Sequence, residues 1–146
     1  MVALTGCGTM RSIPPKIILI VEDEPLVREL SVGHLVDAGF DVREAPTADE
    51  ALSVLNSGAA IVLVFTDVNM PGELDGLQLA AMVRERWPKI RVLVTSGGGQ
   101  VGPALVSPPA EFMAKPYALH EMVAAVTRLT GPPAFVVPVV TPERSA

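Results

Sequence analysis

A short apolar run that ends in a carboxylate is the feature that most constrains the fold of this chain. Residues Ala59–Phe65 are all apolar, and Asp67 follows them where a turn begins. The run has the length of a buried strand and is far too short to cross a membrane. We therefore expect a strand that holds Asp67 at the rim of the core, open to solvent on one side. Such a carboxylate is a ligand, a base or a nucleophile, or it only caps the following helix.

A second apolar run has the same pattern. Residues Lys16–Val21 lead directly into Glu22 and Asp23, and Pro25 then opens a helix. In parallel α/β sheets the carboxyl ends of neighbouring strands share one edge, so Glu22, Asp23 and Asp67 converge if their strands are neighbours. Carboxylates this close raise one another's pKa values, and a hard divalent cation removes the conflict. The sequence therefore predicts a Mg²⁺ site, because Mg²⁺ prefers oxygen ligands.

Two more strand ends add a hydroxyl and a cation. The run Ile90–Val94 leads to Thr95, and Ala110–Ala114 leads to Lys115. At the same edge these groups would suit a phosphoryl group: Mg²⁺ and Lys115 neutralise its oxygens, Thr95 donates a hydrogen bond and Asp67 attacks in line. The sequence thus indicates phosphoryl chemistry at one edge of the sheet.

The remaining patterns predict a doubly wound, five-stranded parallel sheet with flavodoxin-like (βα)5 order. Helix starts and stops follow from prolines, a capping-box pattern and glycines just past helix ends. The predicted strands are 16–21, 41–45, 59–67, 90–95 and 110–114, and the predicted helices are 25–38, 47–58, 75–87 and 119–130.

The fourth helix of such a fold is predicted to be short or absent. Glycines and prolines fill residues 97–110 and oppose a full helix. We expect a single turn around Pro103–Val106, or a mobile loop.

Composition indicates one domain with a flexible N-terminal extension and a tail that could pack on the domain, pair with another chain or be disordered. The chain has 146 residues, of which 49% are hydrophobic and 4% aromatic, as in a buried parallel sheet built from aliphatic side chains. We divide it into an N-terminal extension (1–15), a domain (16–130) and a proline-rich tail (131–146). The net charge is −5 and the sequence has no run or stripe of basic residues, so its charge gives no indication of direct nucleic-acid binding.

The single cysteine bears on the compartment. Cys7 excludes an intrachain disulfide and fits a reducing compartment, so we expect a cytoplasmic protein without a membrane segment. Leu4–Cys7 is faintly similar to a lipoprotein cleavage site, but nothing basic precedes it and the apolar region of a signal peptide does not fit there.

Five motifs follow one another along the chain: Val21–Glu24, Asp67–Pro71, Asp75–Gly76, Val94–Ser96 and Lys115–Tyr117. Four of them lie at the ends of predicted strands, and Asp75–Gly76 opens a predicted helix. Together these motifs resemble the receiver domain of bacterial two-component response regulators over residues 16–130. One departure is the spacing from Pro71 to Asp75–Gly76, which is a residue longer than usual in that family.

The resemblance implies a role for each residue of the site. Asp67 is then the phosphoacceptor and a Mg²⁺ ligand, and Lys115 contacts the phosphoryl group across a cis bond to Pro116. Thr95 is the switch hydroxyl. The resemblance further implies that Asp23 binds Mg²⁺ directly and that Glu22 binds it through water. It also implies that Asn69 offers its backbone carbonyl to the metal and that Phe112 is the switch aromatic.

The resemblance also implies function and partners. We expect a stand-alone receiver that takes a phosphoryl group from a histidine kinase or phosphotransfer protein and then changes its binding to an unknown downstream protein. We expect a monomer or weak dimer, because the altered stretch 97–110 belongs to the family's usual partner-binding face. We expect no output domain after residue 130, and at most slow self-dephosphorylation.

Two other classes remain open. A hydrolase with an aspartate nucleophile usually has a second acid two residues later, where this chain has Asn69. A flavodoxin-like ligand module needs glycines and hydroxyls after its first strand, where this chain has Glu22–Pro25. Multiple-turnover hydrolysis or bound flavin would favour these readings.

Overall fold

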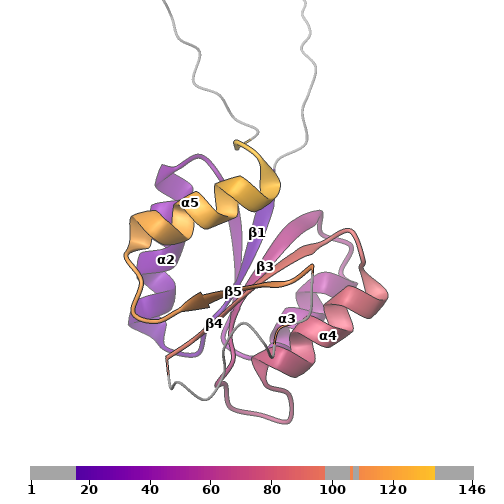
Figure 1. Ribbon diagram of the computed structural model, residues 1–146. Coiled ribbons are helices and arrows are strands. Elements are labelled where there is room, and N and C mark those ends of the chain that lie inside the picture. Colours follow the sequence, from indigo (N-terminus) through magenta and orange to yellow (C-terminus); the bar gives the residue numbers. More distant parts are fainter. Residues whose placement is uncertain (1–15, 98–105, 107–108, 134–146) are drawn as a thin grey trace, which may run out of the picture.

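The molecule is a five-stranded parallel sheet covered by helices on both faces (Figure 1). This computed structural model describes residues 16–97, 106 and 109–133. The strand order is β2-β1-β3-β4-β5, and every neighbouring pair is parallel. The strands are β1 (Ile17–Val21), β2 (Asp41–Ala45), β3 (Ile61–Asp67), β4 (Arg91–Ser96) and β5 (Glu111–Ala114).

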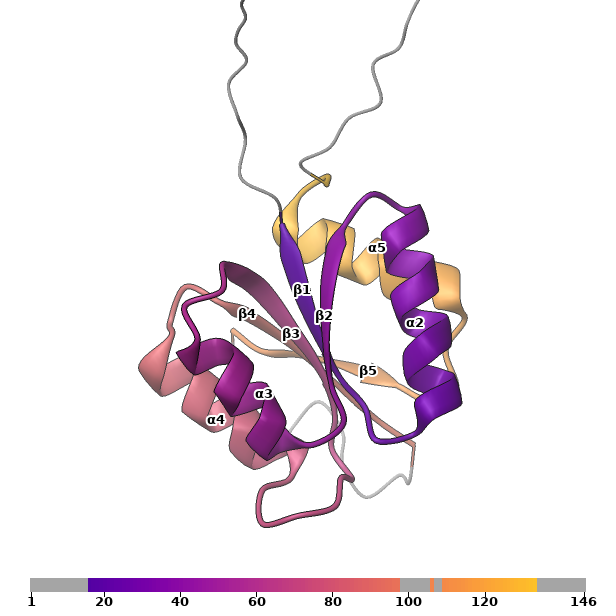
Figure 2. The same cartoon turned by 180° about the vertical axis from the view of Figure 1, so that it is seen from behind.

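The described helices form two pairs. Helices α2 and α5 cover one face of the sheet, and α3 and α4 cover the other, as the two opposite views show (Figures 1 and 2). Their bounds are α2 (Pro25–Asp37), α3 (Ala48–Asn56), α4 (Gly76–Arg86) and α5 (Leu119–Thr130). The predicted α/β fold is confirmed. The predicted bounds of these strands and helices agree with the observed ones to within two residues.

Local signals explain where the helices begin. Pro25 occupies the first turn of α2, where its missing N–H costs nothing. The Thr47 side chain accepts a hydrogen bond from the backbone N–H of Glu50 at the start of α3. Asp75 caps α4 and forms a reciprocal pair of hydrogen bonds with Gln78. These caps satisfy backbone groups that a helix terminus leaves without partners.

The sheet has a hydrophobic layer on each face. Every residue of β1 is buried, and its side chains alternate between the two layers. Leu19 and Val64 pack with residues of α3 and α4, whereas Ile18 and Leu63 pack with residues of α2 and α5. Burial on both faces explains why these strands read as continuous apolar runs.

The strand register brings the predicted site residues to one edge. Val21 pairs with Thr66, so Glu22 and Asp67 follow at the same level of β1 and β3. Asp67 pairs with Thr95, and Ser96 pairs with Ala114, the residue before Lys115. All these side chains therefore lie at the carboxyl edge of the sheet, as predicted.

Several predictions fall outside the described residues. These are the extension 1–15 with Cys7, the tail from 134 onward and most of the stretch 97–110. Within that stretch, Val106 is described and packs into the layer under α3 and α4. Across the described residues, none of the helices has both the length and the apolar character needed to cross a membrane.

Candidate functional site

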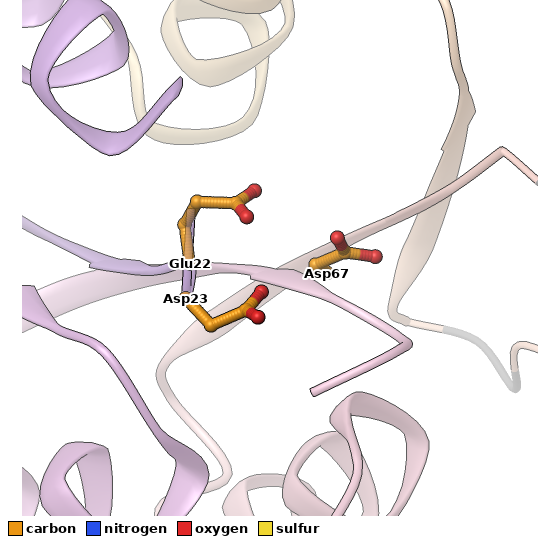
Figure 3. A group of neighbouring side chains, drawn as sticks. All are labelled: Glu22, Asp23 and Asp67. Carbon is orange, nitrogen blue, oxygen red and sulfur yellow. The ribbon is translucent and has the colours of Figure 1, made fainter. Parts of the chain in front are cut away.

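Three carboxylates converge at the carboxyl edge of the sheet (Figure 3). Glu22 and Asp23 come directly after β1, and Asp67 ends β3. One oxygen from each side chain lies within 4.8 Å of the others. Glu22 and Asp67 are buried, whereas Asp23 is exposed. The two acidic motifs predicted to meet therefore do meet, and one of the three carboxylates faces solvent.

Asp67 is more enclosed than its sequence context suggested. Only 7% of the residue is exposed, and the ammonium of Lys115 is in contact with its carboxylate. Its Oδ1 accepts a hydrogen bond of 3.2 Å from the backbone N–H of Asn69. The capping role that the sequence left open for Asp67 belongs instead to Asp75, which caps α4. The carboxylate of Asp67 is thus held by the loop and is not used to start a helix.

Lys115 supplies the fixed positive charge of the site. Its Nζ donates to Asp67 Oδ2 at 2.8 Å and lies 3.9 Å from Glu22 Oε1. The bond between Lys115 and Pro116 is cis, as the resemblance implied. Burial opposes the charge of Lys115, but the hydrogen bond and charge of Asp67, together with Glu22, outweigh it and raise the pKa of the ammonium. Lys115 is therefore charged at neutral pH.

The pKa of the Glu22 carboxyl is raised. Burial is the main cause that raises the pKa of its carboxyl, and the charges of Asp67 and Asp23 add to it. The backbone N–H of Glu24, 3.1 Å from Glu22 Oε2, and the charge of Lys115 act in the opposite direction. The single lysine leaves the cluster with excess negative charge. The oxygen donors and their separation fit a small divalent cation such as Mg²⁺.

Two hydroxyls at the end of β4 have no hydrogen-bond partner. Thr95 Oγ1 and Ser96 Oγ are both buried and unpaired among the described residues. Thr95 lies opposite Asp67 in the sheet, and its carbonyl oxygen accepts a hydrogen bond from the backbone N–H of Val68 at 2.9 Å. Buried polar groups are almost always paired, so an unpaired hydroxyl beside the carboxylate of Asp67 calls for a ligand or a functional role.

Two residues that support Asp67 had no role in the sequence analysis. Thr66 Oγ1 donates to the carbonyl oxygen of Asp67 at 2.9 Å. Gly76, the first residue of α4, lies so close to this carbonyl group that any Cβ would overlap it. The Asp75–Gly76 pair was a visible sequence signal, but the sequence does not show that the start of α4 rests on the end of β3.

The two remaining predicted site residues lie near the cluster in different ways. Asn69 is exposed, and its backbone N–H is used by Asp67. Phe112 is partly buried on β5, where it packs against the layer under α3 and α4. The roles that the resemblance gave to the Asn69 carbonyl and the Phe112 ring stay predictions.

Comparison with known proteins identifies the family. The fold and the site define an α/β module with an acidic pocket, a lysine and a hydroxyl at the carboxyl edge of its sheet. Residues 18–127 match the response regulator receiver domain family. The chain belongs to this family.

Related sequences support this assignment. The chain is 34% identical over 114 residues to the response regulator protein FleR of Pseudomonas aeruginosa, covering 76% of this chain and 24% of that protein. It is 33% identical over 115 residues to the nitrogen assimilation regulatory protein NtrX of Azorhizobium caulinodans, covering 76% and 25%. The chain thus spans about a quarter of the length of these curated relatives.

Three solved structures are matched over almost their whole length. A response regulator receiver protein from Sinorhizobium medicae has a TM-score of 0.75 and 31% identity, covering 82% of this chain and 97% of that one. The receiver domain of NtrX from Brucella abortus has a TM-score of 0.71 and 33% identity, covering 77% and 97%. TrrA from Thermotoga maritima, solved in complex with Mg²⁺ and BeF, has a TM-score of 0.67 and 28% identity, covering 78% and 98%.

Proposed function

We propose that this receiver accepts a phosphoryl group on Asp67 from a histidine kinase or phosphotransfer protein, and that phosphorylation changes which protein it binds. The observation that carries the proposal is the contact of 2.8 Å between Lys115 Nζ and Asp67 Oδ2 inside the acidic cluster. This lysine keeps one oxygen of the nucleophile oriented and stays close to the charge that develops during transfer.

Asp67, Asp23 and Glu22 would hold a Mg²⁺ ion, with the backbone carbonyl of Asn69 as a further ligand. A bound Mg²⁺ supplies charge neutralisation for the oxygens of the incoming phosphoryl group. The Mg²⁺ and BeF reported for the similar receiver TrrA support this proposal.

The transfer step follows from the positions of the side chains. An oxygen of Asp67 attacks phosphorus, the N–P bond of the donor phosphohistidine breaks, and the imidazole keeps the bonding electron pair and takes up a proton. Lys115 then pairs with an oxygen of the new acyl phosphate. The unpaired hydroxyl of Thr95 donates to another oxygen, which would move Thr95 and, through β5, Phe112. The added negative charge thereby biases a surface that other proteins read.

Removal of the nucleophile tests the proposal. Asp67→Asn should abolish incorporation of labelled phosphate from acetyl phosphate or phosphoramidate with Mg²⁺. Asp37→Asn, at the end of α2 on the far edge of the sheet, is the matched control and should incorporate as much as the unchanged protein. Undiminished labelling of the Asp67→Asn chain would show that the nucleophile lies elsewhere.

The proposed role is that of a signalling domain and not of a phosphatase. Asn69 offers no carboxylate for general acid–base catalysis two residues after the nucleophile, so only slow loss of the domain's own phosphate is expected. Sustained turnover of a phosphate monoester would contradict this. The stand-alone and cytoplasmic expectations stay predictions, and the mass and location of the native protein in its host test them.

A further inference from the structure

The exposed apolar side chains of the described residues gather on one helix. The large hydrophobic side chains that are most exposed are Leu26, Leu30 and Val36, at 65%, 48% and 52%, and all three belong to α2. Leu26 and Leu30 are four residues apart and lie on the same side of α2, whereas Val36 lies on a different side. We call Leu26 and Leu30 the α2 apolar face. Single exposed leucines are ordinary, but a group of them on one helix indicates a surface that something covers.

The α2 apolar face borders a hollow beside the acidic cluster. Leu30 and Val27 from α2 line it on one side, and the loop after β5 and the first residue of α5 line the other. Its volume is about 290 Å³, and its lining residues are Val27, Leu30, Lys115, Pro116, Tyr117 and Leu119. Lys115 therefore both lines this mostly apolar hollow and donates a hydrogen bond to Asp67.

The described chain ends next to α2. Helices α2 and α5 lie on the same face of the sheet and end at the same edge (Figures 1 and 2). Lys16 Nζ donates to the carbonyl oxygens of Thr130 and Pro132 at 2.7 and 2.8 Å, which fixes the end of α5 beside the start of β1. The carbonyl oxygen of Lys16 in turn accepts from the N–H of Asp41, shortly after α2 ends. The residues after Pro133 therefore start close to the C-terminal end of α2.

The next residues of the sequence match α2 in length and in chemistry. Ala134–Val140, which we call the tail segment, has no charged side chain and consists of apolar residues around Pro138. Proline favours the extended polyproline conformation, in which the segment would span roughly 22 Å at about 3.1 Å per residue. The 13 residues of α2 span about 20 Å at 1.5 Å per residue. The tail segment can thus run from the end of α5 to the hollow.

We propose that the tail segment docks along the α2 apolar face and places Val139 and Val140 in the hollow beside Lys115. Docking would remove the exposed leucines from water without burying a charge. The docking itself does not depend on phosphorylation of Asp67.

Paramagnetic broadening in the full chain tests this docking. In a Cys7→Ser background, Thr141→Cys with a nitroxide label places the probe just beyond the tail segment and leaves the valines intact. The amide signals of Leu26–Leu30 and Tyr117–Leu119 should lose most of their intensity, while those of α3 and α4 keep theirs. In the matched control, Leu26→Asp with Leu30→Asp should restore the lost signals. Both residues are exposed, so these changes leave the core intact.

Each other outcome overturns the proposal. An undisturbed α2 apolar face would show that this surface serves another protein and not the tail segment. Broadening that survives both aspartates would show that the label approaches for another reason. A mixed sample, in which the label and the isotope are on different chains, gives no broadening if the contact is within one chain. Broadening in that sample would assign the surface to a second copy.

Discussion

Asp67 and Thr95 are neighbours in the sheet, but their polar atoms are satisfied differently. The oxygens of Asp67 are held by the N–H of Asn69 and by the ammonium of Lys115. The hydroxyl of Thr95 is buried and has no partner among the described residues. An unpaired buried hydroxyl contributes no hydrogen bond and carries a desolvation cost. The Thr95 hydroxyl therefore adds little to the stability of the fold, and we expect it to act by binding a ligand in the adjacent site.

Replacement of Thr95 by valine tests this separation. Thr95→Val keeps the shape and removes only the hydroxyl, so the free energy of unfolding should stay within about 1 kcal/mol or rise. The chemical-shift changes that Mg²⁺ and beryllofluoride induce in β4 and β5 should become smaller. Urea unfolding and NMR measure the two effects. Thr66→Val is the contrast, since it removes a hydrogen bond to the Asp67 carbonyl and should lower stability.

Tyr117 allows a pH prediction because it is the only tyrosine of the chain. Burial raises the pKa of its phenol above the usual 10.0, although Lys115 and Ser31 oppose the rise. The folded state thus favours the neutral phenol, so this contribution to stability is complete below pH 10 and is lost as pH rises through the folded pKa. Absorbance titration of the native protein should show tyrosinate forming at higher pH than in the urea-unfolded protein. Coincident titration curves would contradict this.

At the scale of elements, the contact of α4 with β3 is the tightest constraint near the site. Gly76 starts α4 directly against the carbonyl group of Asp67, and its N–H donates to the carbonyl oxygen of Val68 at 2.9 Å. Because backbone meets backbone there, no side-chain rearrangement can make room for a methyl group. The position of Asp67 therefore depends on the absence of a side chain at residue 76.

Two glycine-to-alanine changes distinguish close contact from helix propensity. Gly76→Ala should destabilise the fold by about 1–3 kcal/mol or more, because the added methyl overlaps backbone. Gly33→Ala, in the middle of α2 with open space around it, should be neutral or stabilise by up to about 1 kcal/mol. Denaturant unfolding of both variants gives the comparison. Equal effects would mean that the contact at Gly76 is less constrained than the structure shows.

Sequence patterns predicted the elements better than the contacts between them. The strand of Asp67 and the edge that it shares with Glu22 were predicted from apolar runs. A strand that is buried on both faces is visible in the sequence as a continuous run of apolar residues. The enclosure of Asp67 and the missing partner of Thr95 are not visible in this way. The enclosure depends on contacts between residues far apart in the sequence, such as the hydrogen bond from Lys115 to Asp67.

At the scale of the whole molecule, we expect the acidic cluster to couple the stability of the fold to cation binding. Three carboxylates within 4.8 Å repel one another, and Lys115 is the only cationic group that the described residues place against two of them. A cation that binds only the folded state stabilises it in proportion to its occupancy. The fold should therefore be more stable with Mg²⁺ than without it.

Thermal unfolding with and without Mg²⁺ tests this coupling. At a Mg²⁺ concentration of about 100 times the Kd, the free energy of unfolding should increase by about 2.7 kcal/mol. Asp23→Asn removes one proposed ligand and should reduce the shift. Asp37→Asn, an exposed change at the far edge, should leave the shift unchanged. If Mg²⁺ has the same effect on both variants, the acidic cluster is not its site.

The hydrogen bonds from Lys16 to the end of α5 have a consequence for evolution. They bring the points where the polypeptide enters and leaves the domain together, at the edge opposite the acidic cluster. A neighbouring module could be fused before Lys16 without approaching Asp67. This geometry suits a domain that forms part of longer proteins. In two relatives the matching region makes up about a quarter of the protein.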